Sequence, residues 1–343
     1  MASIYKTFTD NDKATTKQPL HESIPITGSI ISGTYSEEHV KNYGHGMWQS
    51  VYDYPYLSAS SNHIFDLAFG YSSTSVFSSS TSVQNSKKIN MYNQMAKILV
   101  GTDLTGSIQE FDADGDIAAG STKLKDVCFL NFSRLLYKDE IKKGSFSIVI
   151  GSGSLYEPQG DQVAFDTFLT INDSGSAGTA PNYRVNSPAG EYGFLYDTIG
   201  VQQGLIYYQA GVAVLTGSLF GTVLFGTGSN TFIDSMTGST IASSANGFRR
   251  RWYNCAFNNT VELNSEIYFC RAFHNEFNYS ANPTYVSSSK IQVKNEAQDE
   301  PVTYITTIGL YSADNELLAV AKLSEPSKKT PSNELNLRVR LDY

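Results

Sequence analysis

The chain has 343 residues, of which 41% are hydrophobic and 17% are charged, a balance that is ordinary for a folded protein with much β-structure. A chain that is disordered throughout is excluded, because it would be poorer in apolar and aromatic residues. The formal net charge is −8, so the chain lacks the basic field that neutralises nucleic-acid phosphates, and no nucleic-acid partner is expected.

The first part of the chain differs in composition from the rest. Residues 1–45 are polar and rich in turn formers, with Ile24 and Ile26 among a few short apolar anchors, and they predict an extended N-terminal arm or edge hairpin. The first ten residues have neither the basic nor the apolar region of a secretion signal. We therefore expect no secretion.

Residues 46–270 are predicted to form a β-rich body that contains one helix. Apolar side chains at helical spacing predict this helix over 86–100, with Ser86 as its N-cap and Gly101 as its stop signal. A serine- and threonine-rich run at 72–82 predicts a loop.

The other apolar runs of the body predict strands. Runs at 127–132 and 146–150 flank a charged turn and predict a hairpin, and residues 163–171 predict a further strand. The charge-free stretch at 205–226 is long enough to cross a bilayer, but its glutamines, threonines and glycines weaken a membrane helix. We predict two buried strands with a glycine turn there, and no stable membrane insertion.

Asp112, Asp114 and Asp116 are the best candidate for an ion site. Three carboxylates at alternate positions can converge on a cation. The pattern of an EF-hand is not met, because Ile117 and Lys123 stand where that loop needs glycine and glutamate. An acidic surface turn is therefore expected, with neither metal nor cofactor, and a cation would be sought here first.

Catalytic patterns are not found in the sequence. None of the five histidines has the spacing of a zinc protease or of a cysteine-histidine signature, and glycine-rich phosphate loops are missing, so no enzymatic activity is expected. The cysteines Cys128, Cys255 and Cys270 lack the spacing of a disulfide framework, which indicates reduced thiols in a chain made in a cytoplasm. Cys255, Cys270 and His274 have no fourth zinc ligand nearby, so small buried thiols are the expected explanation.

One basic and aromatic cluster occurs in the chain, formed by Arg249, Arg250, Arg251 and Trp252. Interleaved basic and aromatic residues can stack on single-stranded nucleic acid. The acidic balance of the chain instead favours a strand with exposed arginines that pair with acidic groups of a neighbouring subunit. We predict these four residues as a candidate subunit contact.

Residues 271–343 are predicted to form a C-terminal β domain. From residue 302 onward the sequence predicts three strands joined by two polar turns, and the last run alternates polar and apolar residues without a break. One face of that strand carries Leu335, Leu337, Val339, Leu341 and Tyr343. Because chain ends usually fray, such a strand needs something to hold it, and a second chain is one candidate. These five residues are further candidate subunit contacts.

The same region carries a resemblance to a known class of proteins. Residues 302–311, a polar turn at 312–316 and residues 317–326 resemble a hairpin that recurs in tail and baseplate proteins of tailed bacteriophages. The resemblance is carried by Ile-Gly-Leu-Tyr at 308–311 and Leu-Leu-Ala-Val-Ala at 317–321. Further segments are similar to virion proteins of T-even-like myoviruses, especially marine and cyanophage-like ones, at residues 43–57, 62–66 and 273–285. The resemblance implies a virion structural protein and transfers no catalytic residues.

These observations predict a mainly β fold, with an antiparallel β-sandwich-type body, one or two short helices and a C-terminal three-stranded β unit. The expected function is that of a structural subunit of a tailed bacteriophage virion, in the tail or baseplate, assembled in the bacterial cytoplasm. Its expected partners are copies of itself and other virion proteins, which the 22 tyrosines also favour.

Two alternatives remain open. The first is a receptor- or glycan-binding virion module, in which exposed tyrosines with Trp48 or Trp252 would stack on sugar rings and a host surface receptor would be a partner. The second is a structural protein of the neck or capsid.

Overall fold

The computed structural model describes residues 5–342 except 28–36, 80–84, 118–119, 121, 153–166, 174–182, 221–244, 246–247, 250–251, 281–284, 288–289, 292–295 and 297. The chain divides into two compact units. The body unit comprises residues 20–261, and the terminal unit comprises residues 1–19 together with 262–343. The N-terminal residues thus belong with the C-terminal ones, whereas the sequence suggested a separate arm over residues 1–45.

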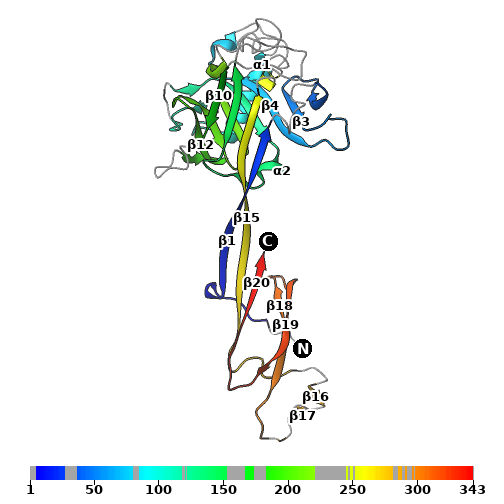
Figure 1. The fold of residues 1–343 in the computed structure, drawn as a ribbon. Coiled ribbons are helices and arrows are strands. Elements are labelled where there is room, and N and C mark those ends of the chain that lie inside the picture. The colour runs from blue at the N-terminus through cyan, green and yellow to red at the C-terminus, as the bar shows by residue number, and fades with distance from the viewer. Residues whose placement is uncertain are drawn as a thin grey trace. The chain divides into compact units, whose positions relative to one another are not determined.

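The fold is mainly β, as predicted, and the body unit is built on a large antiparallel sheet (Figure 1). The strand order is β1-β15-β9-β10-β12-β13-β14-β7-β4-β3-β2. Beside this order, β11 pairs with β12, and β8 pairs with β15. The bounds of these strands are β1 (Lys13–Thr27), β2 (Val40–Asn42), β3 (Trp48–Tyr52), β4 (His63–Tyr71), β7 (Asp126–Phe132), β8 (Glu140–Ile141), β9 (Ser147–Ser152), β10 (Thr167–Asn172), β11 (Tyr183–Ser187), β12 (Gly190–Asp197), β13 (Gln202–Tyr207), β14 (Val212–Thr216) and β15 (Trp252–Ala272). A separate small pair joins β5 (Phe111–Asp112) to β6 (Lys123–Leu124).

The helix predicted at 86–100 is confirmed as α1 (Asn85–Leu99). Tyr92, Ala96 and Leu99 are buried on one face of α1, as their spacing indicates. The backbone N–H of Gly101 donates to the Ala96 carbonyl over 2.9 Å, and a φ of +97° at Gly101 allows this left-handed end. Because α1 begins at Asn85, Ser86 lies in its first turn and is not the N-cap.

The described part of the chain also contains short helices. One is the α-helix α2 (Arg134–Tyr137), and the others are 3-10 helices, η1 (Asp10–Asp12), η3 (Glu37–His39), η4 (Val76–Ser79) and η6 (Gly217–Phe220). The loop predicted at 72–82 corresponds, in its described part, to turns and η4.

Apolar side chains cover both faces of the central strands. In β4, Phe65 and Leu67 belong to one core cluster, while Ala68 belongs to the second cluster, which includes α1. Helix α1 lies close to β4, since a Cβ at Gly70 would come within 2.9 Å of the Tyr92 backbone nitrogen. Glycine at position 70 therefore permits this close helix-to-sheet packing.

Two of the predicted strand pairs can be compared with the structure. The buried strands expected within 205–226 are confirmed as β13 and β14, which pair antiparallel around a turn that ends at Gly211, with a φ of +64°. The hairpin expected over 127–150 is wrong, because β7 pairs with β4 and β14, whereas β9 pairs with β10 and β15. The strands were located correctly, but they do not pair with each other.

The terminal unit contains the three strands predicted after residue 302, namely β18 (Thr303–Tyr311), β19 (Leu317–Lys329) and β20 (Leu335–Asp342). They do not form one three-stranded unit. β18 and β19 form a two-stranded hairpin, whereas β20 lies along β15, pairing from Ser265↔Asp342 to Ala272↔Leu335 (Figure 1). The last strand is therefore held by the chain's own β15. A further small pair joins β16 (Val286–Ser287) to β17 (Lys290–Ile291).

Candidate functional site

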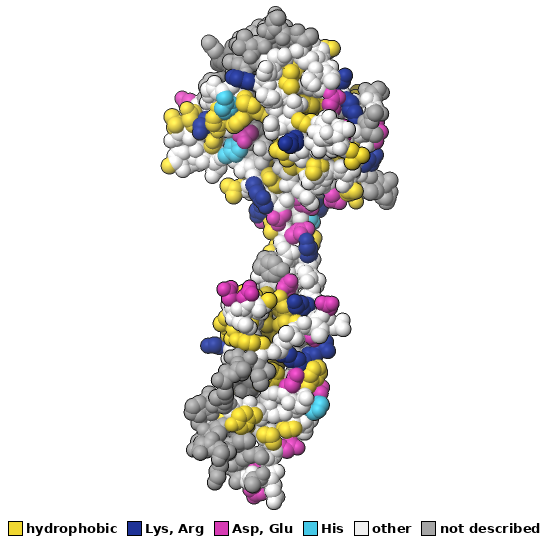
Figure 2. Space-filling view, turned by 180° about the vertical axis from the view of Figure 1, so that it is seen from behind, with side chains coloured by type: hydrophobic (Ala, Val, Ile, Leu, Met, Phe, Trp, Pro, Cys, Tyr) yellow, Lys and Arg dark blue, Asp and Glu magenta, His cyan; other side chains and the backbone are white. Residues whose placement is uncertain are grey.

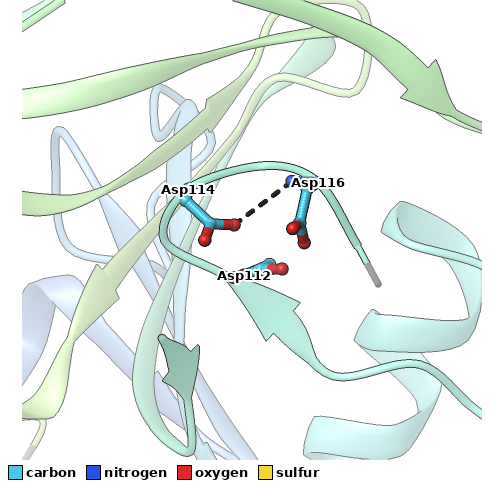
Figure 3. A group of neighbouring side chains, drawn as sticks. All are labelled: Asp112, Asp114 and Asp116. Atoms are coloured by element: carbon cyan, nitrogen blue, oxygen red, sulfur yellow. Dashed lines mark hydrogen bonds between the residues drawn. The ribbon is translucent and has the colours of Figure 1, made fainter. Parts of the chain in front are cut away.

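The three aspartates of the acidic turn lie together in the body unit. Asp112 ends β5, and Asp114 and Asp116 follow in the turn, where their carboxylate oxygens lie within 4.8 Å of one another (Figure 3). The backbone N–H of Asp116 donates to Oδ1 of Asp114 over 3.2 Å. This is the arrangement that the alternate spacing predicted, and these residues could offer one oxygen each to a cation.

The chain itself supplies a positive charge to this cluster. Nζ of Lys123, on the neighbouring strand β6, lies 2.7 Å from Oδ2 of the buried Asp112. Thr122 Oγ1 donates to Asp112 Oδ1 over 3.0 Å and to Asp114 Oδ2 over 2.9 Å. Burial raises the pKa of Asp112, but these hydrogen bonds outweigh burial and hold that pKa below its usual value. The geometry explains a stable acidic turn without requiring an ion.

The zinc ligands considered from the sequence do not converge. Among the described residues, the acidic turn is the one group of three or more such side chains close enough to share an ion, and Cys255, Cys270 and His274 do not form another. All three cysteines are free thiols, with Cys128 and Cys255 buried. Burial raises the pKa of both buried thiols, so they are poor nucleophiles.

The two described residues of the basic cluster, Arg249 and Trp252, are buried. Arg249 is fully buried, and the expectation of an exposed arginine at this position is wrong. Trp252 is also fully buried and stacks on Phe65, with ring centroids 4.7 Å apart. Its indole is therefore part of the core and is exposed neither to a subunit nor to a sugar. Arg250 and Arg251 lie outside the described residues.

The faces of the C-terminal strand follow the predicted alternation. Val339 is buried, and Leu335, Leu337 and Leu341 are half-buried. The intervening polar residues are exposed on the opposite face, namely Asn336, Arg338, Arg340 and Asp342. Tyr343 lies outside the described residues. The apolar face is thus covered in part by this chain, and its role as a subunit contact stays a prediction.

A serine, a histidine and an aspartate meet in the body unit, although no sequence motif signals them. Oδ1 of Asp66 accepts a hydrogen bond from Ser50 Oγ over 2.5 Å and lies 2.9 Å from His63 Nε2. In a hydrolytic triad the imidazole stands between the hydroxyl and the carboxylate, so that it can take the proton of the hydroxyl. Here the carboxylate stands between them. This order does not generate a nucleophile, and the contacts tie β3 to β4.

The terminal unit contains a groove of about 920 Å³. The N-terminal segment forms one part of its wall and consecutive residues of β18 another, with exposed aromatic side chains from Tyr5, Tyr304 and Phe277. Its cations are partly neutralised, because Lys6 pairs with Glu276 and Arg271 pairs with Asp12. The sequence did not reveal this groove, which depends on contacts between the two ends of the chain.

The β18–β19 hairpin has one apolar face that is largely exposed. The exposed fractions of its side chains are 44% for Tyr311, 53% for Leu317, 68% for Leu318 and 51% for Val320. On the other face Leu310 is buried, and Ile308 and Ala319 are half-buried. The space-filling view shows hydrophobic side chains gathered on the terminal unit (Figure 2). A continuous apolar run such as 317–321 is typical of a strand that is covered on both faces.

Comparisons with known proteins identify no relative. No family model matches the chain, and no curated protein or solved structure matches it either. None of the helices in the described part of the chain is both long and apolar enough to cross a membrane.

Proposed function

We propose that the chain is a structural subunit that works by assembly into a larger particle. The observation that carries this proposal is the exposed apolar face of the β18–β19 hairpin. With about 200 Å² for a fully exposed large side chain, Tyr311, Leu317, Leu318 and Val320 together present about 400 Å². A patch of this size on a monomer is often functional.

Within the described part of the chain, the β18–β19 hairpin also has unpaired strand edges. Among the described residues, β18 and β19 form a sheet of two strands, so each strand has one edge whose backbone groups are not engaged by a neighbouring strand. Long apolar edge strands attract other strands unless they are covered, and a two-stranded sheet is marginally stable by itself. Association with another chain would satisfy both the face and the edges.

The proposed particle is the virion of a tailed bacteriophage, with the tail or baseplate as the location. This part of the proposal is supported by the resemblance of residues 302–326 to a hairpin of such proteins. The copies would assemble with one another and with other virion proteins in the bacterial cytoplasm.

A second candidate function rests on the groove of the terminal unit. Exposed aromatic rings beside polar groups are suited to stacking on sugar rings or on a protein receptor. A receptor- or glycan-binding module is therefore the alternative, and glycan-array binding by the purified chain would favour it.

Mass spectrometry of purified phage particles tests the main proposal. We expect the chain at several copies or more per virion, together with density for its β-rich units in a cryo-EM reconstruction. A chain that is expressed during infection but not found in the particles would refute the proposal.

A further inference from the structure

An irregular segment near the N-terminus, residues 5–9, lines the groove of the terminal unit along its whole length, and we call it the strap. The ring of Tyr5 lies against that of Tyr311, at the end of β18, with ring centroids 4.9 Å apart. The next residue, Lys6, contacts residues between 271 and 276, at the end of β15. The strap therefore joins two parts of the terminal unit that both contribute to the groove.

Few contacts hold the strap, and all of them are made by side chains. Among the described residues, no hydrogen bond between backbone groups joins residues 5–8 to another segment. None of its five side chains is buried, and Phe8 alone is half-buried, with its ring centroid 5.3 Å from that of Tyr268. Fixing five residues costs conformational entropy, which exposed contacts offset only weakly. The closed and open positions of the strap should therefore differ little in free energy.

Lys6 makes the charged contacts of the strap. Its Nζ lies 2.6 Å from Oε2 of Glu276, donates to the carbonyl of Arg271 over 2.9 Å and stands 3.8 Å from the ring centroid of Phe273. The hydrogen bond from Lys6 is the main cause that lowers the pKa of Glu276. The backbone N–H of Phe273 donates to the same Oε2 over 3.1 Å and helps to hold this carboxylate in place. One ion pair thus governs the position of the strap.

The base of the strap is anchored independently of Lys6. The backbone N–H and the hydroxyl of Thr9 donate to Oδ2 of Asp12 over 3.0 and 2.7 Å. Asp12 also pairs with Arg271 over 3.1 Å. The strand β1 begins at the following residue, Lys13, and pairs with β15. Loss of the Lys6 contacts would therefore let residues 5–8 move about this base and leave β1 in place.

We propose that the strap is a lid of the groove, which the ion pair between Lys6 and Glu276 holds closed and which opens when this pair breaks. Opening separates Tyr5 from Tyr311 and uncovers the ring of Phe273, so more of the aromatic lining becomes accessible to a ligand or a partner chain. The motion takes place within one chain. It can therefore be present or absent whether or not the chain is found in virions.

Chymotrypsin cleavage after Phe8 measures the opening, because a protease cuts a locally released segment in proportion to its open population. Glu276→Gln removes the charge that holds Lys6 and leaves the sequence around Phe8 unchanged. It should raise the cleavage rate about three- to tenfold. Lys17→Met is the matched control, since it removes another exposed pair of this unit, with Nζ of Lys17 2.9 Å from Oε2 of Glu262. Intact-mass spectrometry follows the cleavage. An unchanged rate with Glu276→Gln, or an equal rise with the control, would overturn the proposal.

Spin labels measure the two positions of the lid directly. Thr7→Cys on the strap and Asn315→Cys, which also lines the groove, would carry the labels in a Cys270→Ser background, because the other two cysteines are buried. Pulsed electron paramagnetic resonance should show a shorter and a longer distance. Glu276→Gln should increase the share of the longer one, and so should about 1 M salt, which screens an exposed ion pair. Circular dichroism checks that each variant is folded. A single distance that neither change alters would refute the lid.

Discussion

Replacing Trp252 by alanine should strongly destabilise the body unit. The indole is fully buried and stacks on Phe65, with ring centroids 4.7 Å apart. Burying about 200 Å² of apolar surface contributes at most about 5 kcal/mol at 25 cal/mol per Å², and Trp-to-Ala changes in cores cost about 3–5 kcal/mol. With a urea slope of about 3 kcal/mol per molar, the unfolding midpoint should fall by about 1 M or more.

Tyr253→Ala is the matched control for this prediction. Tyr253 is the next residue of β15, is 51% exposed and contacts Phe168 at a ring-centroid distance of 4.6 Å. We expect it to cost less than about 1 kcal/mol. Urea unfolding followed by far-UV circular dichroism measures both variants. If they cost the same, or if Trp252→Ala leaves the midpoint unchanged, Trp252 does not have the core role assigned to it.

Three further predictions concern buried side chains. Val339→Ala should lower the free energy of unfolding by about 1–3 kcal/mol. Arg338→Ala, at the exposed neighbouring residue, should lower it by much less. Equal urea midpoints for the two variants would contradict the face assignment. Burial raises the pKa of Asp173 to about 6, so the folded state holds this proton more tightly than the unfolded state. The free energy of unfolding should therefore fall by up to about 3 kcal/mol as pH rises from about 4 to 6. Asp173→Asn should remove this loss. If the stability of Asp173→Asn changes with pH as that of the wild type does, Asp173 is not the group responsible. Burial lowers the pKa of Lys88 to about 8, so the charged lysine lowers the free energy of unfolding by up to about 3 kcal/mol below pH 8. Lys88→Met should therefore raise the urea midpoint at pH 7, and this rise should shrink towards pH 10.5.

Features with a local cause could be predicted from the sequence. Helical spacing located α1, because the side chains that share a helix face are set by residues three and four apart. Strict alternation located β20 and assigned its faces for the same kind of reason. The acidic turn also came together as expected, since its three aspartates lie within five consecutive residues.

Partners that are distant in the chain could not be predicted in this way. The strands β7 and β9 were recognised individually, but the pairing of β7 with β4 and β14 and of β9 with β15 depends on which edges meet after the chain has folded. Alternation says which residues share a face and gives no information about the neighbouring strand. The same limit applies to β20. The sequence left open a second chain as its partner, whereas in the structure β20 pairs with β15 of the same chain.

Burial was likewise decided by the tertiary structure. The charge of Arg249 and the amphipathic indole of Trp252 suggested a surface, yet both side chains are enclosed in the body unit. The sequence after residue 302 predicted strands, but it did not predict that one face of the β18–β19 hairpin stays largely exposed within the described part of this chain. Sequence determines how side chains are distributed along a strand or helix, because that follows from backbone geometry. Which faces are then covered depends on packing between segments far apart in the chain, and only the tertiary structure shows it.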